Sequence, residues 1–177
     1  MLIVGAGVQG RAHLEVFAQV LGVRRFRIAS RSAASAQTLV DHAQALGLQA
    51  DVVPDADAVL ADCPLIVTCT PASGVVLRAL PRVDAFIAAV GAFTPQMVEL
   101  APGLCRHVAA CGRIVVDTRE AEHEAGDLLQ AGIDVGACPS LGDVVRAGQR
   151  DGRGPVLFKS CGWAGWDLAA ARLAMRE

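Results

Sequence analysis

A glycine-rich loop next to the amino terminus is the first stretch whose residue types and spacing point to chemistry. Residues 5–10 read GAGVQG, with Gly5, Gly7 and Gly10 spaced as G-x-G-x-x-G. In such loops the first glycine turns the chain, the second lets the backbone approach a pyrophosphate, and the third lets a helix pack on its strand. The following helix directs unpaired N–H groups at the phosphates. Because the loop lies between a strand-like and a helix-like run, we predict a dinucleotide site.

The end of the next apolar run decides which dinucleotide we expect. NAD-binding proteins place an Asp or Glu there, which bonds the ribose hydroxyls. This sequence has Ser30, Arg31 and Ser32 instead. A guanidinium flanked by hydroxyls suits a 2′-phosphate, which no carboxylate repels here. We therefore expect NADP(H) in preference to NAD(H); the alternative is that Arg31 is an exposed arginine at the end of a strand.

Two later apolar runs also end in residues that could line a site. Thr70 and Pro71 follow the first of them, and Val90, Gly91 and Ala92 end the second. In open α/β folds, ligands bind at the carboxyl edge of the sheet, where both stretches are expected to lie. Ordinary loop chemistry is the alternative for each.

These loops need a scaffold, and the hydrophobic pattern predicts one of alternating strands and helices. Apolar runs predict strands at 2–4, 26–29, 50–53, 65–69, 86–90, 113–116 and 156–158. Helical spacing predicts helices at 9–21, 33–46, 55–60, 75–80, 119–127, 140–147 and 163–175. Such alternation implies right-handed crossovers. The fold class is α/β: a Rossmann-type doubly wound parallel sheet with a C-terminal helical extension.

A polar, glycine-rich stretch, QRDGRGP at 149–155, predicts a linker near the carboxyl end. We expect residues 1–150 to form a dinucleotide-binding domain. Residues 151–177 are then a C-terminal segment of one strand and one helix.

Composition excludes several classes of protein. Hydrophobic residues make up 53% of the chain and aromatic residues only 4%, so small aliphatic side chains must fill the core, as in helix-on-sheet packing. The net charge of −2 predicts no partnership with nucleic acid or an anionic membrane. The most apolar region contains Arg78, Arg82 and Asp84, so no membrane span is predicted.

The amino terminus and the cysteines bear on the compartment. No basic residues precede the first apolar run and three glycines interrupt it, so we predict no signal peptide and expect a cytoplasmic location. The six cysteines show no C-x-x-C spacing. We expect reduced, buried thiols and no metal site.

Four separated motifs occur in the same order as in one known family. They read GAGVQGRAH at 5–13, AVGA at 89–92 with Pro95 and Glu99, VDTREA at 116–121 with EAGD at 124–127, and FKSCG at 158–162. On these motifs the chain resembles the ornithine cyclodeaminase/mu-crystallin family over nearly its whole length. That family includes ornithine cyclodeaminases, an alanine dehydrogenase and ketimine reductases that act on cyclic imino acids.

One position favours a branch of the family. Cyclodeaminases and the alanine dehydrogenase carry a catalytic Asp two residues before a proline, and this sequence has Phe93 there. The chain most resembles bacterial reductases that use NADPH to convert Δ1-pyrroline-2-carboxylate to L-proline and Δ1-piperideine-2-carboxylate to L-pipecolate. Two alternatives stay open: a non-catalytic NADP(H)-binding protein like some mu-crystallin relatives, and a cyclodeaminase or amino-acid dehydrogenase, which Phe93 disfavours.

The resemblance also implies which residues meet which part of the cofactor. They are Gly7, Val8 and Gln9 for the pyrophosphate, Ser30, Arg31 and Ser32 for the 2′-phosphate, Thr70 and Pro71 for the nicotinamide-side ribose, Val90, Gly91 and Ala92 for the nicotinamide, and Lys159, Ser160 and Gly162 for the approach from the C-terminal segment.

Asp117 and Lys159 are the candidate catalytic residues. Asp117 stands at the carboxyl end of a predicted strand, where the alternative is a cap for the next helix. Lys159 is a candidate anchor for a carboxylate or phosphate, and the alternative is a surface lysine whose stem lies along apolar surface. His13, on the first helix behind the loop, is expected to be structural.

The resemblance implies a further lobe before the glycine loop. In the family that lobe carries the arginine and lysine that bind the substrate, and it also forms a homodimer. We expect this chain to lack it, so that only the cofactor-binding part is present. The final helix would then expose an apolar face, including Trp166 and Leu173, or use it in an oligomer contact.

Overall fold

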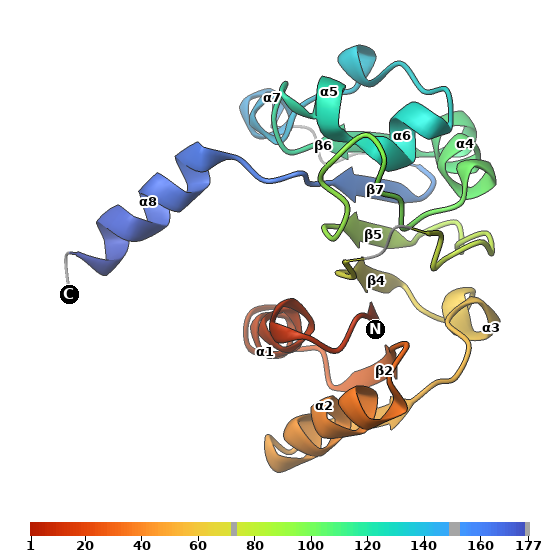
Figure 1. Ribbon diagram of the computed structural model, residues 1–177, viewed down its shortest axis with the longest axis vertical. Coiled ribbons are helices and arrows are strands. Elements are labelled where there is room, and N and C mark those ends of the chain that lie inside the picture. The colour runs from red at the N-terminus through yellow and green to blue at the C-terminus, as the bar shows by residue number, and fades with distance from the viewer. Residues whose placement is uncertain (72–73, 149–152, 176–177) are drawn as a thin grey trace.

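The computed structural model describes residues 1–71, 74–148 and 153–175, and it confirms the α/β prediction. One parallel sheet of seven strands has the order β3-β2-β1-β4-β5-β7-β6, with helices on both faces (Figure 1). The strands are β1 (Leu2–Val4), β2 (Arg25–Ala29), β3 (Gln49–Val52), β4 (Leu65–Thr68), β5 (Phe86–Ala89), β6 (Arg113–Val116) and β7 (Val156–Lys159).

The helices follow the predicted alternation in most places. They are α1 (Val8–Leu21), α2 (Ala33–Ala45), α3 (Asp57–Leu60), α4 (Pro102–Cys111), α5 (Ala121–Glu124), α6 (Gly126–Gln130), α7 (Leu141–Ala147) and α8 (Ala164–Ala174), with a 3₁₀ turn, η1 (Val135–Ala137). Side chains alternate across each strand, so the sheet has two apolar faces. On one face Ile3 and Ile28 pack with α1 and α2; on the other, Leu2 and Val4 pack in a core that includes α3 and α4.

The helix predicted at 75–80 is wrong. This segment is irregular, with bends at Val76 and Ala79, and Leu77 forms an isolated parallel bridge to Leu100. The N–H of Leu77 donates to the carbonyl of Glu99, and the Leu77 carbonyl accepts from the N–H of Ala101. A stretch this short cannot offset the cost of starting a helix, whereas pairing with a neighbouring segment satisfies its backbone and buries Leu77.

Two further segments differ from the sequence prediction. Helix α4 was not predicted, although Pro102 stands in its first turn and Leu104 and Val108 are buried at helical spacing. The helix predicted at 119–127 is divided into α5 and α6. The division lies at Ala125, whose φ of −76° and ψ of +71° are not helical. Next to it, an added Cβ on Gly126 would come within 2.2 Å of the Met97 carbonyl oxygen.

The C-terminal segment contributes one strand to the sheet and then one helix that lies outside the body. Strand β7 pairs with β5 on one side and β6 on the other, while α8 extends away from the rest of the molecule with no buried residue (Figure 1). Part of the predicted linker, residues 149–152, lies outside the described residues. Across the ranges that are described, no helix has the length and apolar character to cross a membrane.

Candidate functional site

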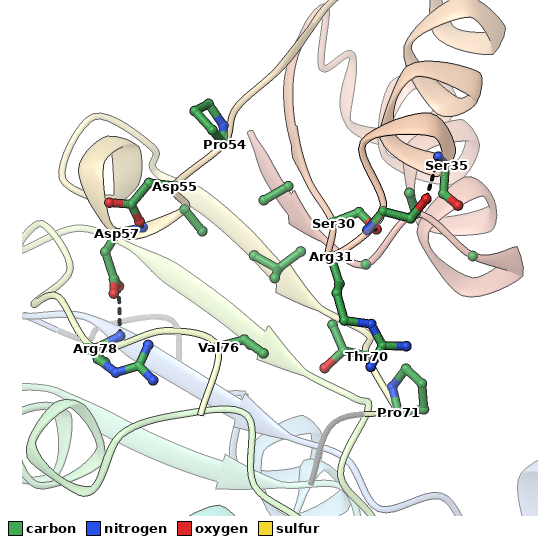
Figure 2. Close-up of a pocket in the computed structure, with 17 residues that line it drawn as sticks. Ser30, Arg31, Ser35, Pro54, Asp55, Asp57, Thr70, Pro71, Val76 and Arg78 are labelled. Atoms are coloured by element: carbon green, nitrogen blue, oxygen red, sulfur yellow. Dashed lines mark hydrogen bonds between the residues drawn. The ribbon is translucent and has the colours of Figure 1, made fainter. Parts of the chain in front are cut away.

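The carboxyl ends of the parallel strands meet at one edge of the sheet, and a cavity opens there. Strand β1 pairs with β2 on one side and β4 on the other, which makes it the point where the strand order changes direction and where α/β folds bind ligands. A cavity of about 580 Å³ lies there, lined by residues from the ends of β1, β2 and β4 and from the loop after β3 (Figure 2).

In the glycine loop after β1, two of the glycines are required because other protein atoms lie too close to admit a side chain. Gly5 has a φ of +114°, and an added Cβ would lie 2.7 Å from the Cys69 carbonyl oxygen. A Cβ on Gly10 would lie 2.0 Å from the Gly5 carbonyl oxygen, so Gly10 lets α1 pack against the loop. A Cβ on Gly7 would meet nothing within 4 Å. Protein packing therefore does not require glycine at position 7. A glycine here leaves room for a ligand that approaches the loop from the cavity.

Ser30, Arg31 and Ser32 line the same cavity. The Ser32 hydroxyl accepts a hydrogen bond from the Ser35 N–H (3.2 Å) and caps α2. Figure 2 shows the Arg31 side chain extending across the opening towards Thr70 and Pro71. Among the described residues, no carboxylate forms an ion pair with Arg31, and its guanidinium is exposed.

The opposite wall of the first cavity was not anticipated from the sequence. It is formed by Asp55, Asp57 and Arg78 (Figure 2). The Asp57 carboxylate accepts hydrogen bonds from the N–H groups of Arg78 (2.7 Å) and Ala79 (2.8 Å). Asp57 thereby holds the irregular segment where a helix was predicted.

A second cavity, of about 500 Å³, lies beside the first, and both are lined by Thr70 and Pro71. Its other lining residues come from the ends of β5 and β7 and from α1: Gln9, His13, Val90, Gly91, Phe93, Ser160, Cys161 and Gly162. Most residues that the resemblance assigned to the nicotinamide end are thus brought together here. His13, expected to be structural, also lines this cavity, with its Nδ1 2.7 Å from the Gln9 carbonyl oxygen.

Three of the predicted cofactor residues line neither cavity. Val8 is exposed on the first turn of α1, and Gly10 and Ala92 are buried. Gly10 contributes through helix packing. The carbonyl of Ala92 accepts a hydrogen bond from the Lys159 ammonium, so Ala92 shapes its loop from within the core.

Glu99 belongs to one of the family motifs but had no predicted role, and its carboxylate is fully buried. Its Oε1 accepts hydrogen bonds from the N–H (2.7 Å) and the hydroxyl (2.8 Å) of Thr70. Its Oε2 accepts from the hydroxyl of Thr68 (2.9 Å) and the N–H of Gly91 (2.8 Å). Glu99 therefore joins the ends of β4 and β5. A glutamate between Val98 and Leu100, in an otherwise apolar stretch, was the signal that could have identified it.

Lys159 is the only lysine in the sequence, and it is completely buried. Its Nζ lies 3.1 Å from Asp127 Oδ2 and donates hydrogen bonds to the carbonyls of Ala89 and Ala92. The alternative of a surface lysine is therefore wrong. A buried ammonium needs such a partner because removal of two charges from water is costly. Lys159 does not line either cavity, so the geometry lends its predicted catalytic role no support.

Asp117 is also committed to contacts within the protein. Its Oδ2 accepts hydrogen bonds from the Ser160 hydroxyl and from the N–H groups of Cys161 and Gly162, each at 2.8 Å. Its Oδ1 accepts from the N–H of Thr118 at 2.8 Å. Asp117 holds the segment after β7 against the second cavity, which it does not line. Glu120 is the residue that stands at the start of α5, so Asp117 is not its cap.

All six cysteines belong to the described part of the chain and are free thiols. Cys161 lines the second cavity, and Cys69 comes directly before Thr70 in the chain. Burial, together with the charge of Glu99, raises the pKa of the Cys69 thiol to about 12. Burial also raises the pKa of the Cys161 thiol to about 12. Both stay protonated at neutral pH, so neither suits a nucleophilic role.

The sequence was compared with those of known protein families and proteins. A sequence model of the ornithine cyclodeaminase/mu-crystallin family matches residues 1–177. The chain belongs to this family. Delta(1)-pyrroline-2-carboxylate reductase 2 of Burkholderia ambifaria is 38% identical over 98% of this chain and 54% of its own length. Mouse ketimine reductase mu-crystallin is 31% identical over 98% of this chain and 53% of its own length.

A solved structure extends the family likeness to the fold. The structure of Thermococcus litoralis Delta(1)-pyrroline-2-carboxylate reductase, in complex with NADH and L-proline, aligns with a TM-score of 0.86 at 25% identity. The alignment covers 98% of this chain and 56% of that one. The chain thus spans about half the length of the relatives that it matches.

Proposed function

We propose that this chain is the cofactor-binding part of an NADP(H)-dependent reductase of cyclic imino acids. The observation that carries the proposal is the pair of adjoining cavities, which share Thr70 and Pro71 and follow the carboxyl edge of the sheet from Arg31 to Ser160. An elongated ligand with two ends fits this arrangement. The relatives' names supply the reaction class, since several are reductases of Δ1-pyrroline-2-carboxylate.

The residues present fit a dinucleotide. The open space over Gly7 admits a pyrophosphate, and the first turn of α1 presents its N–H groups there. The adenosine half would then occupy the first cavity and the nicotinamide the second. When bound, the nicotinamide supplies the hydride that reduces a C=N bond. Thr70, Gly91 and Ser160 orient that ring and limit its contact with water.

The preference for NADP(H) over NAD(H) rests on Arg31. Its guanidinium faces the first cavity without a carboxylate partner among the described residues, and Ser30 lies beside it. A phosphate on the ribose 2′ oxygen would form charge-assisted hydrogen bonds with these groups. The T. litoralis relative carries NADH in its structure, so cofactor preference is a property to measure in this protein itself.

The substrate would bind next to the nicotinamide, in the second cavity. Phe93, which is 54% exposed, lines that cavity and carries no charge or proton. This favours reduction of a preformed imine over cyclodeamination, which in the family uses an aspartate at this position. We infer that groups recognising the substrate carboxylate come from a further lobe of the longer protein, against which α8 packs in a homodimer.

A second candidate function is NADP(H) binding without catalysis. It is favoured by the fact that Asp117 and Lys159 are both fully engaged within the protein. Among the described residues that line the second cavity, His13 is the only histidine, and none is an aspartate, a glutamate or a lysine.

Cofactor binding and turnover separate these candidates. NADPH binding is measured by titration calorimetry, and NADPH oxidation is followed at 340 nm with Δ1-pyrroline-2-carboxylate and Δ1-piperideine-2-carboxylate. Both are measured on this chain and on a protein extended upstream. We expect the chain to bind NADPH and the extended protein to reduce both imines. Binding without turnover in the extended protein would leave the non-catalytic function.

A further inference from the structure

The buried carboxylate of Glu99 and its partners Thr68, Thr70 and Gly91 form a bridge between the ends of β4 and β5, here called the Glu99 bridge. We propose that Glu99 is a positioning residue that sets the binding geometry at the nicotinamide end of the cofactor. The inference rests on the proposed function. Glu99 lines neither cavity, whereas Gly91 lines the second one and Thr70 lines both, so its effect must pass through them.

The bridge requires a carboxylate. Each oxygen accepts one backbone N–H, from Thr70 on Oε1 and from Gly91 on Oε2. A hydroxyl can rotate to become an acceptor, but a backbone N–H can only donate. A glutamine here would face one of these N–H groups with its own NH₂, whichever way the amide turned. An isosteric change would therefore open one side of the bridge.

The two loops are too close for such a change to stay local. A Cβ on Gly91 would lie 2.2 Å from the Thr70 carbonyl oxygen and 2.5 Å from Glu99 Oε1. There is thus no room for even a methyl group between the loops. If the Glu99 bridge opens on one side, Thr70 and Gly91 must move relative to each other, and the wall of the second cavity moves with them.

Glu99 itself is held firmly on its main-chain side. The Asp127 carboxylate accepts hydrogen bonds from the N–H groups of Glu99 (2.6 Å) and Leu100 (2.8 Å). Asp127 is in turn paired with the buried Lys159. Because its backbone is fixed, the Glu99 side chain cannot follow the loops if they separate, so it sets their spacing.

The test compares two ligands on one variant. NADPH spans both cavities, whereas adenosine 2′,5′-bisphosphate reaches only the first. We expect Glu99→Gln to weaken NADPH binding about tenfold or more, the effect of a lost hydrogen bond to a charged group. Binding of the bisphosphate should weaken much less, because Gly91 does not line the first cavity. Titration calorimetry on the full chain gives both affinities. Glu120→Gln, at an exposed position away from both cavities, is the matched control.

A second variant covers the case in which Glu99→Gln does not fold. Thr68→Val removes only the hydroxyl bond to Oε2, in a side chain that lines neither cavity. We expect a smaller loss of NADPH affinity and faster hydrogen exchange at the Gly91 amide, measured by NMR in the ligand-free chain. Normal NADPH affinity in this variant would overturn the inference if Glu99→Gln is not folded.

The outcomes distinguish this inference from the proposed function. If the wild-type chain binds both ligands and Glu99→Gln weakens them equally, or weakens neither, the inference fails and the proposed function stands. If the wild-type chain binds neither ligand, the proposed function fails and the inference fails with it. Selective loss of NADPH affinity supports both.

Discussion

Individual charged residues of this site fall into two groups that differ in what they can still bind. Glu99, Asp117, Asp127 and Lys159 are buried and engaged within the protein. Arg31 is exposed at the mouth of the first cavity. Recognition of an anion therefore depends on the exposed arginines of the first cavity, Arg31 and Arg78, while the buried groups determine the positions of the loops.

Replacement of Arg31 tests the preference for NADP(H). We expect Arg31→Ala to weaken NADPH binding about tenfold to a hundredfold, because charge-assisted hydrogen bonds to the 2′-phosphate are lost. NADH affinity should not change, and Arg24→Ala, at an exposed position outside the cavities, should alter neither. Both affinities follow from calorimetry. A wild-type chain that binds NADH more tightly than NADPH would contradict the assignment.

The thiols provide a test of burial at the site. Burial raises the pKa of Cys69, Cys105 and Cys161 to about 12, whereas Cys111 is exposed. At pH 8 we expect iodoacetamide to label Cys111 and to spare these three, as read by peptide mass spectrometry. Their pKa values are raised on folding, so their contribution to stability is present below about pH 9 and is lost as the pH rises towards 12. Rapid labelling of Cys69 in the folded chain would show that the site is more open than the structure indicates.

Secondary-structure elements bring these residues together because parallel strands end at one edge of the sheet. The ends of β1, β2 and β4 form the first cavity, and those of β4, β5 and β7 contribute to the second. The glycine loop before helix α1 lines the first cavity, and Gln9 and His13 of the helix itself line the second.

Two alanine substitutions in the glycine loop are expected to differ in effect: one should lower stability, and the other should prevent NADPH binding. Gly10→Ala places a methyl group against the Gly5 carbonyl oxygen, so we expect it to lower the free energy of unfolding by about 1–3 kcal/mol or more. Gly7→Ala meets no protein atom, so it should leave stability intact and abolish NADPH binding. Urea unfolding and calorimetry measure the two properties. Equal stability of the two variants would contradict the packing role of Gly10.

The buried ion pair joins β7 to α6 and can be tested by a double-mutant cycle. Lys159→Met leaves the Asp127 carboxylate unpaired in the core, and we expect a loss of about 3–5 kcal/mol in the free energy of unfolding. Adding Asp127→Asn should restore much of the lost free energy of unfolding, because the amide oxygen still accepts hydrogen bonds from the N–H groups of Glu99 and Leu100. Urea unfolding of the three variants measures the coupling. If the loss of stability in the double variant equals the sum of the losses in Lys159→Met and Asp127→Asn alone, the pair is not coupled.

The molecule as a whole has a packed body and one helix that stands apart from it. Helix α8 has no buried residue, and Trp163, Trp166, Leu168 and Leu173 are each about half or more exposed. An apolar surface of this kind on a monomer is typical of an interface. Its position away from the body (Figure 1) matches the proposal that a further lobe covers it.

Removal of this helix should therefore be harmless to the body. Truncation after Gly162 is expected to leave the unfolding temperature unchanged, since no core contact is lost. It should also reduce concentration-dependent association of the chain, measured by light scattering. A large drop in unfolding temperature would show that α8 packs on the body in solution.

Sequence patterns determined what depends on local spacing: the order of the strands along the chain, the glycine loop, and Ser30 to Ser32 at the end of β2. Each of these features depends on residues that are close in sequence, and each is present in the structure. The same reasoning failed at 75–80, where the segment pairs with Leu100 across the fold instead of forming a helix. Only the tertiary structure placed β7 between β5 and β6 and closed the Glu99 bridge. Those arrangements depend on contacts of buried polar groups with residues that are far away in sequence. A local sequence pattern contains no information about such contacts.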